Sequence, residues 1–556
     1  MRPASRPNIE NPAGLHKPDA RTARKSYSCC VVRGFAGIRR TGHVSAGRVS
    51  AARVSAVLVC AALVATWGLS AGTSLALEPR SLTEPRVLQH PAAVTNVVDA
   101  FDEGGGIDLH FTLGYEYTWK RAGISRETPS PLASPSGALG TARFHVADFS
   151  EITSRLNVRA DLGLYHDLAL IVRMPVILSR HSTLEGPPLP SGALDGAPGE
   201  PLFSVPFSSP NRSGVEYLAV GVDWGILNQW RDAAQPTFVI GAEGRFSISE
   251  PMHACGPSRP PLMEGDPVEV RCAQPGDINR DGVSGQFSSE VAPGRTESLE
   301  GDFSAQSRKA GVSRGTTGLE LHSMISRRFE QLEPYMGLGL LFELPNSGSD
   351  FGPDRPWKES LSSRAGVSVG AEIMPWEVVE QFQRLSVDLR FTGTYNASGR
   401  DYSELFDALG SSDSLSYRRP NFAGYQANQD AGASALSVVD PDSERVFPTG
   451  ISNVDAYGAY ALRVLARWQA GRYVHFDVGG GWSLTQRHVL TLGAPCDPSR
   501  SVDLEHSGPC VSNLPEPHSL GAPDPSYRPE LEQPGHRFIV DTASTIDAWL
   551  GATVMF

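Results

Sequence analysis

Charged side chains recur at every second position in several segments of this sequence, with apolar residues between them. In a β-strand this spacing places the charges on one face and the apolar residues on the other. Acidic and basic groups occur in similar numbers, so one interpretation is a hydrated passage whose charges select solutes. The alternative is a set of salt bridges that fills an interior and braces its wall. These candidate lining residues are Glu116, Lys120, Arg155, Arg159, Asp161, Arg173, Glu243, Arg245, Asp388, Arg390, Arg463, Arg467, His475 and Asp477.

Three of these candidates are arginines on two successive segments of the chain. Arg155 and Arg159 share one segment, and Arg173 lies on the next. If the interior is a passage, this side would favour anions or carboxylates, because their charge is opposite to that of the guanidinium groups. The hypothesis predicts that replacing these arginines shifts ion selectivity toward cations.

A second chemical motif, in the segment 249–315, has the spacing of a calcium-binding loop. Positions 1, 3, 5 and 6 of that loop would be Asp277, Asn279, Asp281 and Gly282. Their oxygens and the turn-forming glycine resemble those of EF-hand-type and dockerin-like loops. The match is partial, because position 12 is Ser288 instead of a bidentate Glu. Two interpretations stay open: a calcium site that could bridge to lipopolysaccharide phosphates, and an Asx-rich turn.

Hydrolytic chemistry would need a histidine, a nucleophile and an acid in one place. His181 with Ser182 and, separately, His488 begin two of the long connections described below, but spacing supplies no third member for either. We therefore expect no enzyme and no cofactor beyond the calcium hypothesis.

Residues 401–410 predict a short helix with a capping box of Asp401 and Glu404 and an end at Gly410. That helix would fold over the mouth of the interior or lie exposed on neighbouring loops.

The elements that must position these residues are long strands. Apolar and polar residues alternate from 107 to 120, which is longer than the usual strand of a soluble sandwich and long enough to cross a bilayer. The same pattern predicts twelve strands, and the last one ends on the terminal aromatic residue Phe556, as closing strands of outer-membrane barrels do. The predicted strands are approximately 107–120, 152–164, 168–178, 215–227, 237–248, 316–329, 334–344, 363–374, 384–396, 455–468, 473–485 and 541–556.

The connections between these strands alternate in length. Those after even strands are short, approximately 165–167, 228–236, 330–333, 375–383 and 469–472. Those after odd strands are longer, approximately 121–150, 180–214, 249–315, 345–362, 397–454 and 486–540. Short turns on one side and long loops on the other are typical of outer-membrane barrels. The predicted fold class is therefore all-β, a transmembrane antiparallel up-and-down barrel of about twelve strands.

The N-terminal region indicates export. An apolar run at 54–67 follows two arginines, and small residues at 74 and 76 fit cleavage near Ala76; an uncleaved anchor is the alternative. Residues 1–76 hold 11 Lys and Arg against 2 Asp and Glu, so the whole-chain charge of −12 becomes −21 without them. A nucleic-acid partner is then not expected, because phosphate binding needs a basic face. We predict a leader at 1–76, a periplasmic segment at 77–105 and a barrel at 106–556.

Four cysteines follow the leader, and an even number in an exported chain suggests disulfides. The local pairings are Cys255 with Cys272 and Cys496 with Cys510, each within one long connection. Closing a loop of this length could contribute roughly 3 kcal/mol if the bond is unstrained. Metal binding is the rival interpretation, but the sequence has no CxxC motif and no nearby histidine cluster.

Two stretches carry a family resemblance. ADLGLYHDLALIVRMP (160–175) and LEPYMGLGL (332–340) resemble hairpins of a porin-like outer-membrane family named for transport in the meta-pathway of phenol degradation. The resemblance covers the strands only, from about 106 to 556, and implies an exported channel of unspecified solute. We therefore expect a passive or weakly selective channel, with membrane lipid, lipopolysaccharide, small solutes and, through the C-terminal strand, the barrel assembly machinery as partners. The alternative is a filled structural barrel that acts through disulfide-stapled surface loops.

Overall fold

The structure is a computed structural model, and it describes most of the chain beyond residue 93. The described residues are 94–98, 100, 108–130, 140–256, 272, 309–346, 349–351, 361–412, 414, 417, 419–420, 445–446, 449–493, 496–497, 510, 518–523, 527 and 529–556. They belong to one compact unit, Ser74–Phe556.

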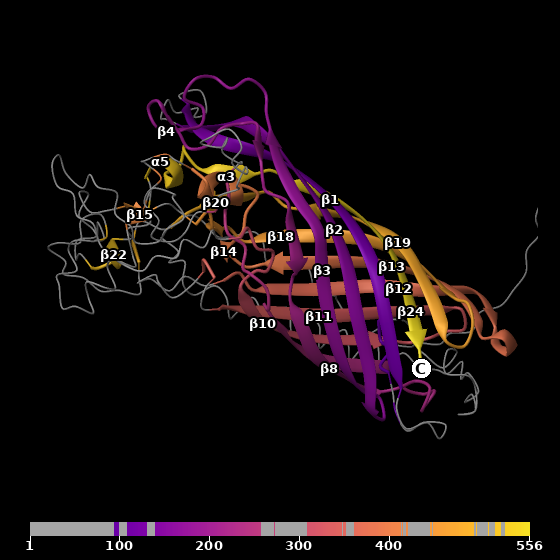
Figure 1. Cartoon of the computed structure of the whole chain (residues 1–556). Helices are drawn as coiled ribbons and strands as arrows, with labels where there is room; N and C mark the ends of the chain where they lie inside the picture. Colours follow the sequence, from indigo (N-terminus) through magenta and orange to yellow (C-terminus); the bar gives the residue numbers. More distant parts are fainter. Residues whose placement is uncertain are drawn as a thin grey trace, which may run out of the picture. The chain divides into compact units, whose positions relative to one another are not determined.

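Among the described residues, twelve antiparallel strands form a closed barrel, which confirms the predicted fold class and strand count (Figure 1). Each strand pairs with the next along the chain, with register shifts in the β1–β2, β2–β3, β8–β9 and β12–β13 pairs. The barrel strands are β1 (Leu109–Ser130), β2 (Gly140–Tyr165), β3 (Leu168–Glu185), β8 (Leu218–Leu227), β9 (Thr237–Phe246), β10 (Thr316–Ser326), β11 (Leu332–Pro345), β12 (Arg364–Val378), β13 (Gln383–Asn396), β18 (Tyr457–Gln469), β19 (Val474–Thr485) and β24 (Ala543–Met555).

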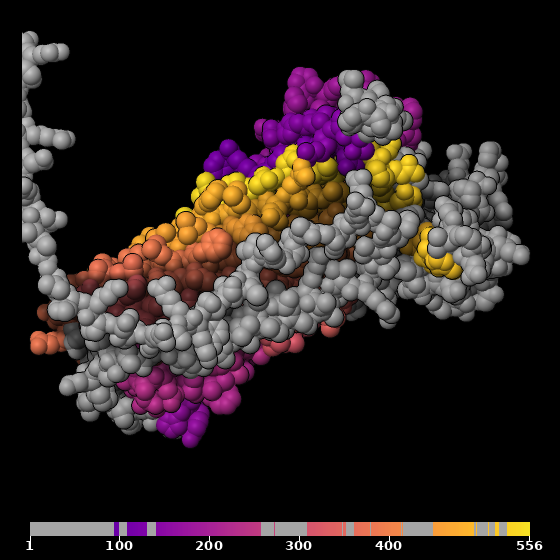
Figure 2. All heavy atoms as spheres, turned by 180° about the vertical axis from the view of Figure 1, so that it is seen from behind, coloured from indigo at the N-terminus to yellow at the C-terminus, as the bar shows by residue number. Residues whose placement is uncertain are grey.

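The barrel closes where its first and last strands meet. β24 pairs with β1 from Met555 opposite His110 to Ser544 opposite Arg121. The terminal Phe556 extends this pairing, since its backbone N–H donates to the carbonyl of Leu109 at 2.9 Å. Figure 2 shows the indigo N-terminal strands beside the yellow C-terminal strand on the outer surface. Closure leaves the barrel without an open sheet edge.

The outward face of the barrel is an apolar belt. Leu113, Val222, Leu389, Leu462 and Leu550 are among many large apolar side chains that stay exposed there. Aromatic residues gather toward both ends of the belt, as in the interfacial girdles of membrane barrels; among them are Tyr165, Trp224, Trp376, Trp468, Tyr395, Tyr460 and Trp482. Such a surface is stable only against lipid, and the chain is therefore an outer-membrane β-barrel protein.

Except for the connection between β1 and β2, the connections sort by length as predicted. Five short turns, 166–167, 228–236, 327–331, 379–382 and 470–473, lie at one end, which we call the turn end. The C-terminus lies at the same end in Figure 1. The opposite end, where α3 (Phe406–Gly410), β4 (Asp195–Ala197) and β20 (His488–Thr491) are seen, is called the loop end. No helix in the described parts of the chain is long and apolar enough to span a membrane.

The predicted loop 121–150 is wrong, because β1 and β2 stay paired through most of it. Their register runs from Leu109 opposite Leu162 to Ser130 opposite Gly140. The alternation of lipid-facing residues ends near Lys120, but Ile124 and Val146 beyond it are fully buried in an apolar core at the loop end. Burial of these side chains keeps the two strands together outside the membrane. β3 likewise runs beyond its predicted end, to Glu185.

The short turn 379–382 contains the 3-10 helix η2 (Val379–Gln381). The smaller elements of the loop end are β4 (Asp195–Ala197), β5 (Glu200–Pro201), β6 (Phe207–Ser208), β7 (Arg212–Val215), β14 (Gly399–Asp401), α3 (Phe406–Gly410), β15 (Arg419–Pro420), β16 (Arg445–Val446), β17 (Ser452–Val454), β20 (His488–Thr491), β21 (Cys496–Asp497), β22 (Ala522–Pro523), α5 (Pro529–Glu532) and β23 (Phe538–Val540).

The predicted helix 401–410 is shorter in the structure, and its predicted capping box is wrong. Helix α3 begins at Phe406, and its N-cap residue Leu405 makes no side-chain cap hydrogen bond. Asp401 and Glu404 do not cap the helix, because their carboxylates form ion pairs with other parts of the barrel. The helix does end at Gly410, as predicted.

Candidate functional site

The fourteen predicted lining residues all lie on barrel strands, on the face opposite the apolar belt. Glu116 stands opposite Arg155 in the β1–β2 register, and Arg390 stands opposite Arg463 between β13 and β18. Their neighbours along each strand, such as Leu389 and Phe391, are exposed on the outside. The period of 2 therefore directs these charges inward; their contact with a passing solute stays a prediction.

Ion pairs link many of these charges along the wall. On one side, the Arg173 Nε donates to Glu243 at 2.7 Å, and the Arg245 Nε donates to the same carboxylate at 3.1 Å. Arg245 also pairs with Glu320 on β10. Because β3, β9 and β10 lie close together in the sheet, this cluster follows the wall and does not cross the lumen.

Two further clusters occupy the opposite wall. The Tyr335 hydroxyl donates to Asp388, and the Arg390 Nε donates to the tyrosine oxygen at 2.9 Å. The Arg467 Nε donates to Asp477 at 2.7 Å, with His475 beside the same carboxylate at 3.4 Å. Both clusters join neighbouring or next-neighbouring strands, so they brace the wall.

At the loop end, ion pairs attach a loop segment to three different parts of the barrel. We call residues 401–412 the mouth segment. Its three carboxylates, spaced three residues apart, each pair with a cation from a different part of the chain. Asp401 pairs with Arg314 at 2.8 Å, Glu404 with Lys120 at 2.8 Å and Asp407 with Arg212 at 2.5 Å. The segment is therefore anchored to β1, to β7 and to the residues before β10.

The apolar side chains of the mouth segment complete its closure. Leu405, Ala408 and Leu409 are buried in the loop-end core together with Ile124 and Phe538. Phe406 packs into a second cluster with Met252, Ala254 and Ile451. This placement decides between the two predicted positions of the helix: it folds over the mouth. Burial of four such side chains stabilises the closed arrangement by several kcal/mol, at about 1.5–3 kcal/mol for each large one.

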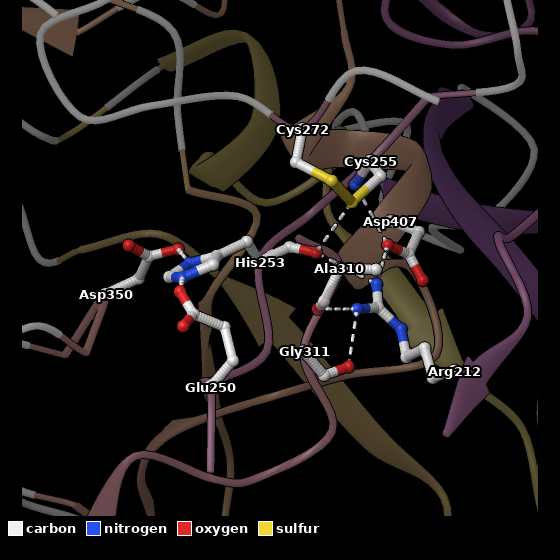
Figure 3. The surroundings of a disulfide bond; sticks show 9 residues. All are labelled: Arg212, Glu250, His253, Cys255, Cys272, Ala310, Gly311, Asp350 and Asp407. Atoms are coloured by element: carbon white, nitrogen blue, oxygen red, sulfur yellow. Dashed lines mark hydrogen bonds and ion pairs between the residues drawn. A yellow bond between two sulfur atoms is a disulfide. The ribbon is translucent and has the colours of Figure 1, made fainter. Parts of the chain in front are cut away.

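A disulfide lies directly against this segment, as Figure 3 shows. Cys255 and Cys272 are bonded, and the backbone N–H of Cys255 donates to the Asp407 carboxylate at 3.1 Å. The buried Arg212 also donates to the carbonyls of His253, at 2.9 Å, and Ala310. The guanidinium thus ties the disulfide-bearing connection to the mouth segment.

Electrostatics favour the charged form of two of the three anchoring carboxyls. Burial opposes ionisation of Glu404, but Lys120 and His488 outweigh it, so the pKa of Glu404 lies well below its usual range. Burial also opposes ionisation of Asp401, yet Arg314 and Arg364 lower its pKa. For Asp407 burial dominates over Arg212, and the pKa of that carboxyl is raised.

The turn end of the lumen is narrowed by residues 94–98, which were predicted only as part of a periplasmic segment. Thr95 is buried, and its hydroxyl lies 2.8 Å from that of Ser326 on β10. A cavity of about 180 Å³ remains between this segment and the wall. Its polar lining includes Asn96, His110, Arg159, Asp161, Asp223, Arg467, His475 and Asp477.

The other predicted site residues have mixed outcomes. Both disulfides, Cys255–Cys272 and Cys496–Cys510, are confirmed. The calcium candidates Asp277, Asn279 and Asp281 lie outside the described residues, and within the described parts of the chain no group of three or more His, Cys, Asp or Glu is placed to hold a metal ion. His181 lies 3.4 Å from Ser208 instead of Ser182, and His488 is buried beside Glu404 and stacked on Tyr457.

The mouth anchors Asp407, Arg212 and Arg314 were missed by the sequence analysis, as was the lumen segment 94–98. The spacing of Asp401, Glu404 and Asp407 was the one local signal, because it places acids at regular intervals among apolar residues. Their partners could not be found from spacing, since Lys120, Arg212 and Arg314 lie far away in the chain.

Comparison with known proteins gives a distant structural likeness and no family. No family model matches the chain, and no curated sequence matches it. Among similar solved structures are the COG4313 outer membrane channel from Pseudomonas putida F1 (8% identity, TM-score 0.31, 80% of this chain and 95% of that one) and a Pseudomonas aeruginosa FadL homologue (9% identity, TM-score 0.27, 86% and 95%). A deltaS2 mutant of the TodX monoaromatic hydrocarbon channel is also similar (7% identity, TM-score 0.28, 84% and 94%). The fold assignment rests on the strand pairing described above.

Proposed function

We propose that this chain is an outer-membrane channel for small solutes, held closed at its loop end by the mouth segment. The observation that supports this most is that the mid-barrel charges pair along the wall, with the cations Arg173, Arg463 and Arg467 partly exposed to the lumen. Charges that filled the interior would have to pair across it and lose their contact with water. A wall of paired but hydrated charges is what a passage for polar solutes requires.

Glycines on the inward face add support. Gly339 faces the lumen opposite His322, and a β-carbon placed on it would have no other atom within 4 Å. At Gly366 and Gly551, also inward, the nearest atoms would lie at 3.6 Å or beyond. Small residues at these positions leave space that larger side chains would occupy, and a barrel of twelve strands is wide enough to keep some of it open.

A filled barrel that acts through its surface loops remains the second candidate. It is favoured by the loop-end core, which buries Leu405, Leu409 and Phe538 over the mouth, and by the disulfide that staples the adjoining connection. The two candidates differ in one property: in a channel the mouth segment must be able to leave this core, and in a filled barrel it never does.

Single-channel conductance of the refolded protein from residue 77 separates the two candidates. The wild type would be compared with D401N/E404Q, which removes two anchoring charges with little change of shape. D455N, an exposed carboxylate at the loop end, is the matched control. We expect brief openings in the wild type and in D455N, and long openings in the double variant. A folded, heat-modifiable double variant that stays silent would reject the channel and support the filled barrel.

The proposed topology assigns the remaining partners. The turn end, with the C-terminus, would face the periplasm, and β24 with its terminal Phe556 would be the segment that the barrel assembly machinery recognises. The apolar belt would contact membrane lipid, and the loop end would lie among lipopolysaccharide headgroups. Calcium at Asp277, Asn279 and Asp281 stays a prediction, and conductance with and without calcium would test whether it affects gating. No step of this function requires catalysis.

A further inference from the structure

In most of the lumen ion pairs the cation is more exposed than the carboxylate. The Arg463 side chain is 48% exposed, whereas its partner Asp547 is 7% exposed. The Arg159 side chain is 41% exposed and Asp161 is 11% exposed. Arg173 and Glu243 differ in the same direction, at 32% and 6%. A solute in the lumen therefore meets the guanidinium groups first.

The same order holds in most of the other lumen pairs. Arg364 is more exposed than Asp401, Arg390 than Asp388, and Arg467 than Asp477. The exposures of Arg245 and Glu320 are nearly equal, and at the two ends of the barrel the order is reversed in Arg328 with Glu377 and in Arg212 with Asp407. The reason is geometric: an aspartate is short and stays near the backbone, while arginine carries its charge on a long stem.

A pair with this orientation is a dipole whose positive end points to the barrel axis. The pair has no net charge, but the nearer charge dominates the potential that a solute feels. For an ion about 4 Å from the guanidinium and about 7 Å from the carboxylate in water, Coulomb's law gives roughly twofold enrichment of an anion and twofold depletion of a cation, which is about a fourfold preference for the anion per pair. Several such dipoles around one lumen act in the same direction, and low-dielectric walls focus their field.

We propose that the lumen selects anionic solutes, with small carboxylates or phosphates as the preferred class. The proposal rests on the proposed channel function and names its solute class. It runs against the charge of the whole chain, which is −12 and would by itself attract cations. Guanidinium groups suit carboxylates and phosphates because their donors match two oxygens at once.

Ion selectivity in a salt gradient tests the proposal. The test variant is R159Q/R463Q in the D401N/E404Q background, in which two anchoring charges of the mouth segment are removed. The control in the same background is R487Q, because Arg487 is an exposed cation outside the lumen strands. In the background and in R487Q we expect a reversal potential that shows a higher permeability to chloride than to potassium. R159Q/R463Q removes the cation of two pairs and leaves their carboxylates, so it should lower that permeability ratio by at least roughly sixteenfold, about fourfold for each pair. A cation-selective background, or an unchanged ratio in R159Q/R463Q, would overturn the proposal.

A second measurement does not depend on conduction. Trp549 faces the lumen opposite Glu116, and the Arg463 guanidinium lies 5.6 Å from the centre of its ring. The fluorescence difference between the wild type and W549F isolates this residue, and its quenching by iodide can be compared with quenching by caesium. We expect iodide to quench more strongly and R463Q to remove the difference. Stronger iodide quenching in a barrel that does not conduct would reject the channel and keep the proposal that the lining attracts anions. Equal quenching, stronger quenching by caesium, or no quenching by either ion would overturn the lining itself.

Discussion

The Glu404 carboxylate lies 2.8 Å from the Lys120 ammonium, and this ion pair joins the mouth segment to the first strand of the barrel. Glu404 is buried, and the His488 Nε2 lies 3.9 Å from the same carboxylate. Burial opposes ionisation of Glu404, but Lys120 and His488 outweigh it and lower its pKa. The contact therefore places a charged carboxylate in the buried part of the mouth segment, so its removal should weaken the attachment of that segment to the barrel.

Replacing Glu404 should loosen the mouth segment. Removing one partner of a buried pair leaves the other uncompensated and costs about 3–5 kcal/mol; Lys120 is partly exposed, so we expect E404A to cost toward the lower end of this range. Hydrogen exchange of the amides in residues 401–412 would measure the effect. We expect much faster exchange there in E404A and no change in D455N. Equal protection of the segment in E404A and the wild type would show that the apolar core alone keeps it in place.

Acid should open the mouth, but only well below neutral pH. Asp401 and Glu404 have lowered pKa values in the closed state, so their stabilisation is fully present above their usual pKa of 3.8 and 4.5 and is lost as the pH falls through the lower values. Asp407, whose pKa is raised, acts in the opposite sense and loses stability as the pH rises through its own pKa. We expect open probability to stay constant from about pH 6 to pH 8 and to increase below about pH 4. An open probability that rises already between pH 8 and pH 6 would contradict this assignment to the two carboxylates.

The two disulfides should differ in their effect on the mouth. Cys255–Cys272 and Cys496–Cys510 span 17 and 14 residues, so the chain-entropy contribution of each is about 3 kcal/mol. The backbone N–H of Cys255 donates to Asp407 in the mouth segment. We expect C255S/C272S to increase amide exchange in residues 401–412 and to lengthen channel openings.

The control for that experiment is C496S/C510S, which should lower overall stability by a similar amount and leave the mouth unaffected. Thermal unfolding of both variants in detergent would confirm that they lose comparable stability. If both variants loosened residues 401–412 equally, the effect would come from global destabilisation and not from the contact between Cys255 and Asp407.

Two substitutions of one strand test which face meets lipid. Leu389 lies on the exposed outer face of β13, and Thr392 lies on the inner face, where its hydroxyl is 3.1 Å from that of Ser368. An arginine on the lipid face of a membrane barrel costs about 2–4 kcal/mol near the bilayer centre. We therefore expect L389R to lower the unfolding free energy in phospholipid vesicles by that amount and T392R to change it much less. The reverse order would mean that the faces are assigned the wrong way round.

The sequence by itself determined the barrel. Successive side chains of a strand point to opposite faces, with a period of 2. The residues from Leu385 to Tyr395 therefore define the inner and outer faces of their own strand without knowledge of the neighbouring strands. The parity of loop lengths, the number of strands and the inward direction of the charges follow from that local property. The disulfides were also within reach, because each bond joins cysteines of one connection.

Only the tertiary structure decided which charges meet and how the lumen is closed. Lys120, Arg212 and Arg314 come together around residues 401–407 because the barrel closes and brings its loops to one end, and no local pattern encodes that arrangement. The capping box failed for the same reason, since a long-range ion pair satisfies Asp401 and Glu404 better than a helix end does. Residues 94–98 also look ordinary in the sequence, and their place in the lumen depends on a wall built from strands that follow much later in the chain.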